Sequence, residues 1–179
     1  RGVSVRLSLG GSIERILFSN LTIETRIFDA AWWGRGEPIQ IQALPWTASS
    51  PLGVIRDVRF SNLICRGENG IVVYAAEPGH IENVTFDRVD VRIDRPREFP
   101  GGRQDFRPSE PDPMPEMATA GFLLRHAAGV AIRDCSVAWG PRPPAYFRYA
   151  LDAAACPGLD PSGLRGAAAQ PGLPAQLIR

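Results

Sequence analysis

The sequence predicts an all-β fold, a parallel β-solenoid of about five coils with long inserted loops. A strand-like motif recurs along the chain, and its apolar residues alternate in twos, as in strands, rather than following the helical period. Glycine and proline are frequent, with 18 and 17 of 179 residues, so turns should be common and long helices scarce. With 44% hydrophobic and 22% charged residues, the composition suits one globular domain over residues 1–179.

The repeated motif reads I-x-x-[IV]-x-F-x-x-[LV]-x-[ICV]. Clear copies occupy residues 12–23, 54–65 and 80–91, a fainter copy occupies 130–137, and a fifth, near 159–164, is degraded by Pro161. The alternation shifts phase near Asn20 in the first copy and near Asn62 in the second, which predicts two short strands meeting at a corner. A further strand-like run precedes each copy, at residues 3–9, 38–44, 70–75, 121–125 and 149–154. Each unit should therefore be strand, turn, strand, corner, strand.

Equivalent residues of successive coils stack at about 4.8 Å, so like side chains fall on like. Phe18, Phe60 and Phe86 should form an interior aromatic ladder. Two of the three cysteines should also lie in ladders, as buried apolar residues rather than as disulfides or metal ligands. One of these ladders holds Ile23, Cys65, Val91 and Val137, and the other holds Leu21, Leu63, Val89 and Cys135.

Insertions separate the predicted strands. They fall at residues 24–36, 45–53, 92–120 and 139–148. The insertion at 92–120 is rich in proline and charged residues, and we expect solvated, extended chain that crosses or caps the solenoid. A disordered linker is the alternative for this segment. The alternative fold is an antiparallel β-sandwich, which would need more hairpin turns than the isolated Asn69-Gly70.

The composition excludes several classes of function. A formal charge of +1 argues against a dedicated nucleic-acid binder, and no apolar run approaches the roughly 20 residues of a membrane-spanning helix. All 20 basic residues are arginine, which excludes lysine Schiff-base and P-loop chemistry. His80 and His126 lack partners at metal-ligand spacing, so neither a metal nor a cofactor is expected. The chain begins directly in strand-like sequence without a signal peptide, which suggests a piece of a longer protein and leaves the compartment undetermined.

The clearest candidate site is WWGRGEP, at residues 32–38. Trp32 and Trp33 offer flat apolar faces on which sugar rings stack, while Arg35 and Glu37 offer groups for sugar hydroxyls. The alternative is that the tryptophans close the side of the solenoid and that Arg35 and Glu37 pair locally.

A second candidate is CRGENG, at a strand end, where Arg66, Glu68 and Asn69 could face a ligand groove. A polar turn held by Asn69 is the alternative. Arg6 lies inside a strand, where a charge is unexpected unless that face is solvated or carries a site. Its planar guanidinium suits a carboxylated sugar, and a surface pair with Glu14 is the alternative.

Glycoside hydrolysis needs two carboxyl groups that flank one bond. The chain has no Asp-Asp dipeptide, and Asp87, Asp90 and Asp94 follow strand spacing in the third copy of the motif. No catalytic pair can be assembled from these residues, so no catalytic residue is assigned.

The segments GSIERILFSNLTIETR, WWGRGEPIQIQALP, IRDVRFSNLICRGENGIVVYAAEPGHIENVTFDRV and GGRQDFRP resemble the C-terminal half of glycoside hydrolase family 28, the polygalacturonase-like pectin hydrolases, over roughly residues 1–166. The resemblance implies a right-handed parallel β-helix and inverting hydrolysis of pectic polysaccharide by aspartates, without a metal. It also implies a polysaccharide or oligosaccharide substrate and a secreted or periplasmic location.

The family's Asn-x-Asp, Asp-Asp and His-Gly motifs have no match in this chain, and the catalytic aspartates would lie upstream of Arg1. Its Arg-x-Lys motif is matched only by Arg6, because Ser8 replaces the lysine. The resemblance thus implies a substrate-carboxylate contact for Arg6 alone. The alternatives are a non-catalytic glycan-binding β-solenoid, and a structural solenoid or a lyase or epimerase on the same scaffold.

Overall fold

The computed structural model describes all residues 1–179 as an all-β chain of thirteen strands in two sheets, without a helix. The short-strand sheet contains β1 (Val3–Leu7), β3 (Ile39–Ala43), β5 (Ile71–Ala75), β7 (Phe122–Arg125), β11 (Leu151–Ala154) and β13 (Gln176–Ile178). The long-strand sheet contains β2 (Ser12–Glu24), β4 (Val54–Gly67), β6 (Ile81–Ile93), β8 (Ala127–Ala128), β9 (Ala131–Arg133), β10 (Cys135–Trp139) and β12 (Leu164–Arg165).

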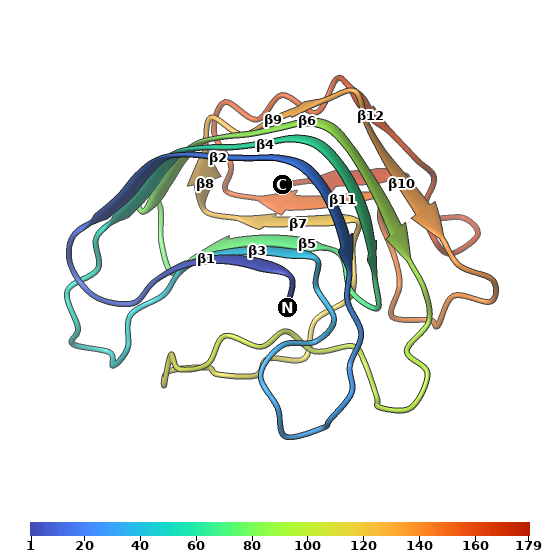
Figure 1. The fold of residues 1–179 in the computed structure, drawn as a ribbon, viewed down its shortest axis with the longest axis horizontal. Coiled ribbons are helices and arrows are strands. Elements are labelled where there is room, and N and C mark those ends of the chain that lie inside the picture. The colour runs from blue at the N-terminus through green and yellow to red at the C-terminus, as the bar shows by residue number, and fades with distance from the viewer.

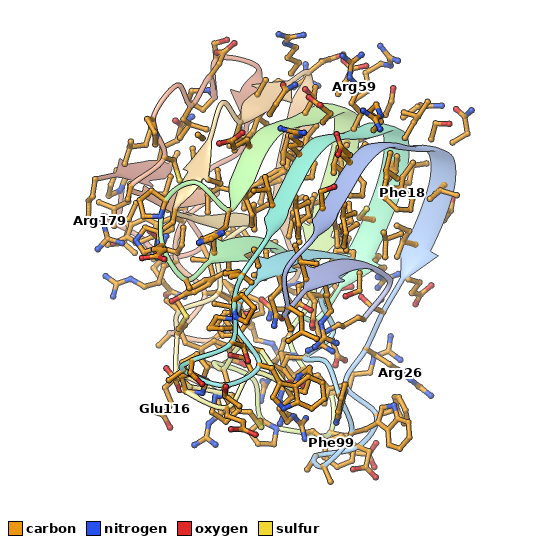
Figure 2. The ribbon with its side chains drawn as sticks, turned by 90° about the vertical axis from the view of Figure 1, so that its left-hand side faces the viewer. Phe18, Arg26, Arg59, Phe99, Glu116 and Arg179 are labelled. Atoms are coloured by element: carbon orange, nitrogen blue, oxygen red, sulfur yellow. The ribbon has the colours of Figure 1, made fainter.

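The chain alternates between the two sheets, which lie as facing layers (Figure 1). Interior strands pair in parallel with strands of the preceding and following turns of the chain, for example β4 with β2 and with β6. Figure 2 shows β2 at the edge of the long-strand sheet, where it carries Phe18. Parallel pairing throughout both sheets makes the antiparallel sandwich wrong, and the arrangement is consistent with a β-helix-like fold.

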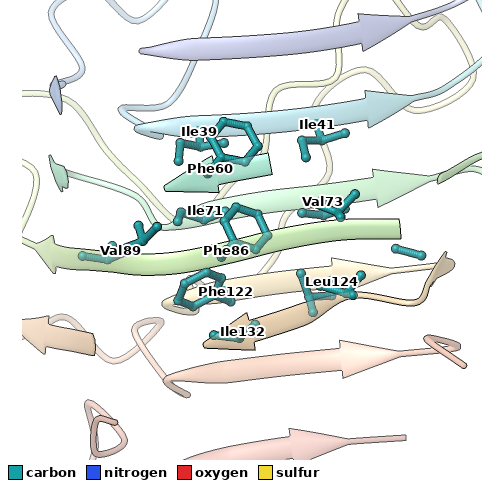
Figure 3. Packing of buried hydrophobic residues seen from close by; sticks show 14 of the residues in the cluster. Ile39, Ile41, Phe60, Ile71, Val73, Phe86, Val89, Phe122, Leu124 and Ile132 are labelled. Carbon is teal, nitrogen blue, oxygen red and sulfur yellow. The ribbon is translucent and has the colours of Figure 1, made fainter. Parts of the chain in front are cut away.

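The phenylalanine ladder is confirmed. Phe18 pairs with Phe60 and Phe60 with Phe86, with ring centroids 5.0 and 5.2 Å apart and ring planes within 14° of parallel. The edge of Phe122 continues the column from the opposite sheet, 5.3 Å from Phe86 (Figure 3). Phe60 and Phe86 are fully buried, whereas Phe18 is only partly buried because β2 is an edge strand.

The predicted corner is confirmed at Asn20 and Asn62, which adopt left-handed conformations with φ of 57° and 59°. Asparagine tolerates this region better than most residues, and Asn62 also donates a side-chain hydrogen bond of 2.6 Å to Asn20. A second bend, which we did not infer from the sequence, lies at Arg15, Asp57 and Asn83, also with positive φ. Each long strand therefore bends twice, and its pairing skips one residue at each bend.

The two cysteines expected in ladders lie in the core. Cys65 pairs with Ile23 and Val91, and Cys135 is fully buried. Burial raises the pKa of Cys65 to about 12 and that of Cys135 to about 11, so both remain thiols. The cysteines are apolar filling, as expected.

The insertion after β6 differs from the expectation of solvated chain. Its residues 104–109, called the strap below, include the buried Gln104, Asp105, Phe106 and Ser109. Phe106 joins a second apolar cluster on the outer face of the short-strand sheet, which contains Leu44, Val72, Ala120 and Leu123. The insertion does cross the sheet, and its strap is largely buried because it covers these outward apolar side chains, whereas other parts of the insertion, such as residues 110–113, are exposed as expected. No helix in the structure is long and apolar enough to cross a membrane.

Candidate functional site

The sequence candidates other than Arg6 lie in two segments on one side of the molecule, and the long insertion lies beside them. The loop between β2 and β3 carries WWGRGEP, the end of β4 carries CRGENG, and the long insertion follows β6. Because β2, β4 and β6 are neighbours in one parallel sheet, the loops that follow them meet. Figure 2 shows Arg26 of the first loop with Phe99 and Glu116 of the insertion below the sheets.

Glu37 and Arg35 are buried in this loop scaffold rather than facing a groove. The Glu37 carboxylate accepts a hydrogen bond of 2.8 Å from Nε of Arg1 and another from the backbone N–H of Arg35. The Arg35 guanidinium donates to the carbonyl of Ala30 at 3.1 Å. These contacts agree with the local pairing that the sequence left open as the alternative.

Glu68 and Asn69 are also buried and join loops. Glu68 accepts hydrogen bonds from the backbone N–H groups of Ile27, at 2.7 Å, and Arg97, at 3.3 Å. Asn69 donates to Oε1 of Gln104 at 3.0 Å, which connects the β4 turn to the strap. Both side chains are thus occupied by the protein itself.

Arg66, in contrast to these buried residues, is exposed. It forms an ion pair of 2.6 Å with Asp94 and lines a polar cleft of about 350 Å³. The cleft lining comprises Glu24, Thr25, Arg26, Arg66, Gly67, Glu68, Asp94 and Arg97. It has no apolar wall, so it offers no face on which a sugar ring could stack.

Asp105 is a central residue of the scaffold that sequence reasoning did not single out. Its buried carboxylate accepts hydrogen bonds from the Arg107 guanidinium and, at 2.6 Å, from the N–H of Gly34. Burial by itself would raise the pKa of Asp105, but these hydrogen bonds and the charge of Arg1 outweigh it and hold the pKa below its usual value. The Asp-x-Arg spacing was the only signal in the sequence that could have indicated this pair.

Arg6 and Trp33, in contrast, come together at the surface. The Arg6 guanidinium lies 5.5 Å from the centroid of the Trp33 ring, and that of Arg107 lies at 6.0 Å. Trp33 remains 49% exposed despite these contacts. Burial lowers the pKa of Arg6, and the neighbouring charge of Arg1 lowers it further, but an arginine remains charged at neutral pH.

A shallow depression of about 510 Å³ lies beside this pair. Its lining comprises Arg6, Leu7, Ser8, Leu9, Trp33, Trp46 and Pro108. Trp46, 46% exposed, was missed because it stands alone after Pro45 without a recognisable motif. Two indole rings beside a guanidinium can stack on the C–H faces of a sugar and donate hydrogen bonds to its oxygens.

The structure therefore divides the candidates. Arg6 and Trp33 line the depression, whereas Arg35, Glu37, Glu68 and Asn69 hold the loops together and Arg66 lies in the polar cleft. Trp32 is 64% exposed but does not line the depression.

No group of three or more His, Cys, Asp or Glu side chains is placed to hold a metal ion. No family model matches the chain, and no curated protein or solved structure matches it significantly.

Proposed function

We propose that this chain is the C-terminal, substrate-binding part of a polygalacturonase-like glycoside hydrolase that acts on pectic polysaccharide by inverting hydrolysis. In this proposal the chain contributes the depression beside Arg6 and Trp33, and the acid and base come from protein outside residues 1–179. The order of WWGRGEP and CRGENG and the position of Arg6 in β1 support the family assignment.

The proposed fold is a right-handed parallel β-helix of about five coils. Five times along the chain a strand of the short-strand sheet is followed by a strand of the long-strand sheet, from β1 and β2 to β11 and β12, which supports the number of coils. Parallel strands of one sheet that are joined through a second layer cross over with right-handed geometry in about 98% of cases, which supports the handedness.

The single observation that carries the function is the exposed Trp33 ring beside the Arg6 guanidinium, with Trp46 on the same depression. A pectic chain presents carboxylates and hydroxyls at the edges of its rings and C–H groups on their faces. Arginine recognises the former and indole the latter, so both kinds of group are present at one place.

Binding tests the proposal. Isothermal titration of the chain with galacturonate and rhamnogalacturonan oligosaccharides should give saturable binding that Trp33→Ala weakens. The matched control is Trp32→Ala, since Trp32 is more exposed than Trp33 but does not line the depression. Absence of binding by every pectic oligosaccharide, from a folded chain, would overturn the proposal.

The second candidate is a non-catalytic glycan-binding solenoid. The observation that favours it is that the buried carboxylates of Glu37, Glu68 and Asp105 are all engaged in contacts with the protein. Protein extended upstream of Arg1 distinguishes the two candidates: release of new reducing ends supports the hydrolase, and binding without release supports the binding module.

A further inference from the structure

The strap forms a wall across the outer face of the short-strand sheet. The carbonyl of Asp105 accepts a hydrogen bond of 2.9 Å from the Gln40 side chain, and that of Phe106 accepts one of 2.8 Å from Gln42. Both glutamines lie on β3, so the strap follows this strand. Farther along, Ser109 donates a hydrogen bond of 2.8 Å to the carbonyl of Pro45, just beyond β3.

The strap also packs against the strands beyond β3. The Phe106 ring packs against Tyr74 of β5, with centroids 4.4 Å apart, and contributes to the cluster with Val72 of β5 and Leu123 of β7. The outer faces of β3, β5 and β7 are therefore covered near the middle of the sheet. The outer face of β1 is different, because Arg6 there contacts only the near side of the strap through the carbonyl of Arg107.

The depression ends at this wall. Its lining combines Arg6 and Leu7 of β1 with Trp33, Trp46 and, from the strap, Pro108. A ligand in the depression meets the strap when it extends in the direction from β1 to β3.

Resting on the proposed function, we propose that the depression binds the terminus of a glycan chain and rejects its internal stretches. A polymer that lies along the stacking direction of the strands would have to pass from β1 over β3, where the strap occupies the outer face. Only a sugar at a chain end can fill the depression and stop at Pro108. The strap is thus a specificity determinant that selects chain ends.

A length series measures this directly with the intact chain. Polygalacturonate fractions that differ about tenfold in mean length are titrated at equal mass of sugar, and binding is followed by calorimetry. End binding predicts the same Kd per polymer molecule for both fractions, so the longer one binds about tenfold more weakly per unit mass. Equal Kd per unit mass would overturn the inference while leaving pectin binding intact, whereas no binding at any length would overturn the proposed function.

A strap excision supplies the second measurement. Residues 103 and 116 pair as an antiparallel bridge, and the N–H of Met117 donates to the carbonyl of Gly102 at 3.0 Å, so the ends of the segment meet. Replacing residues 104–115 by two glycines should make the Kd constant per unit mass of polymer instead of per polymer molecule. Because the excision also removes Arg107, which holds the Trp33 loop, Arg107→Ala is the control: it should weaken binding but leave the Kd per polymer molecule independent of length. If a folded excision variant still has the same Kd per polymer molecule for short and long polymers, the proposed role of the strap is overturned. If the variant does not fold, the length series on the intact chain decides alone.

Discussion

Arg107 and Asp105 form a two-armed ion pair within the strap, with Nε and Nη2 of Arg107 at 2.9 and 2.8 Å from the two carboxylate oxygens of Asp105. The same guanidinium donates hydrogen bonds of 2.9 Å to the carbonyls of Ala31 and Trp32. The pair therefore connects the strap to the loop that carries Trp33. The geometry of the depression depends on a buried carboxylate that does not itself line it.

Asp105→Asn should lower the free energy of unfolding by about 3 kcal/mol, because removing one charge of a buried pair leaves its partner uncompensated. Chemical denaturation at neutral pH measures this loss. The control is Asp112→Asn, an exposed position in the same insertion, which should change stability very little. Equal stability of the two variants would show that the Asp105 pair contributes nothing.

The stability difference between the wild type and Asp105→Asn should depend on pH. The pKa of Asp105 is lowered in the folded protein, so its stabilisation is fully present above the unfolded-state pKa, about 4. The difference should be constant from neutral pH to about pH 5 and should shrink as pH falls through the folded-state pKa. Denaturation curves at a series of pH values measure it. A difference that grows on acidification would contradict the assigned direction.

Phe86→Ala should cost roughly 3 to 5 kcal/mol, from lost burial and from the cavity left in the ladder. Phe18→Ala should cost less, since Phe18 is stacked on one side only and is partly exposed. Phe28→Ala is the control, because Phe28 is 60% exposed. Urea denaturation gives the free energy of unfolding of all three variants. A loss under about 1 kcal/mol for Phe86→Ala would show that Phe86 does not contribute to the core.

The sequence predicted the strands well because a ladder repeats its own pattern. Equivalent positions such as Ile13, Ile55 and Ile81 must be apolar in every copy, so aligning the copies yields the register of β2, β4 and β6. The bend at Asp57 was overlooked although the motif marks it, because the two residues between Ile55 and Val58 shift the apolar alternation just as the two before Leu63 do at Asn62.

The site was harder to predict for a physical reason. Glu37 and Glu68 are of a residue type that suits a binding site. Whether such a carboxylate faces a ligand or a backbone N–H depends on how neighbouring loops pack. The burial of the strap was missed for the same reason, because Phe106 packs against Val72 and Leu123, which belong to other segments of the chain. The residue pattern within one segment does not reveal such contacts between segments.

Glu37→Gln and Trp33→Ala should separate stability from binding. Glu37→Gln weakens a buried ion pair with Arg1, so it should cost about 2 kcal/mol of stability while the Kd of the folded chain for a pectic oligosaccharide stays the same. Trp33→Ala should do the reverse, because the half-exposed ring contributes little to the core. Denaturation and titration of both variants provide the comparison. Loss of binding in a stably folded Glu37→Gln variant would show that Glu37 contributes to the ligand site.

The three thiols should react in an order set by burial. Burial raises the pKa of Cys65 to about 12 and that of Cys135 to about 11, and it also raises the pKa of the partly buried Cys156. Only the thiolate is nucleophilic, so at pH 8 Cys156 should be alkylated by iodoacetamide first, and the two ladder cysteines should react only when the sheets open. Peptide mapping of the alkylated chain over time gives the three rates, and denaturant should bring them together. Rapid labelling of Cys65 in the native chain would mean that the ladder it shares with Ile23 and Val91 is open to solvent.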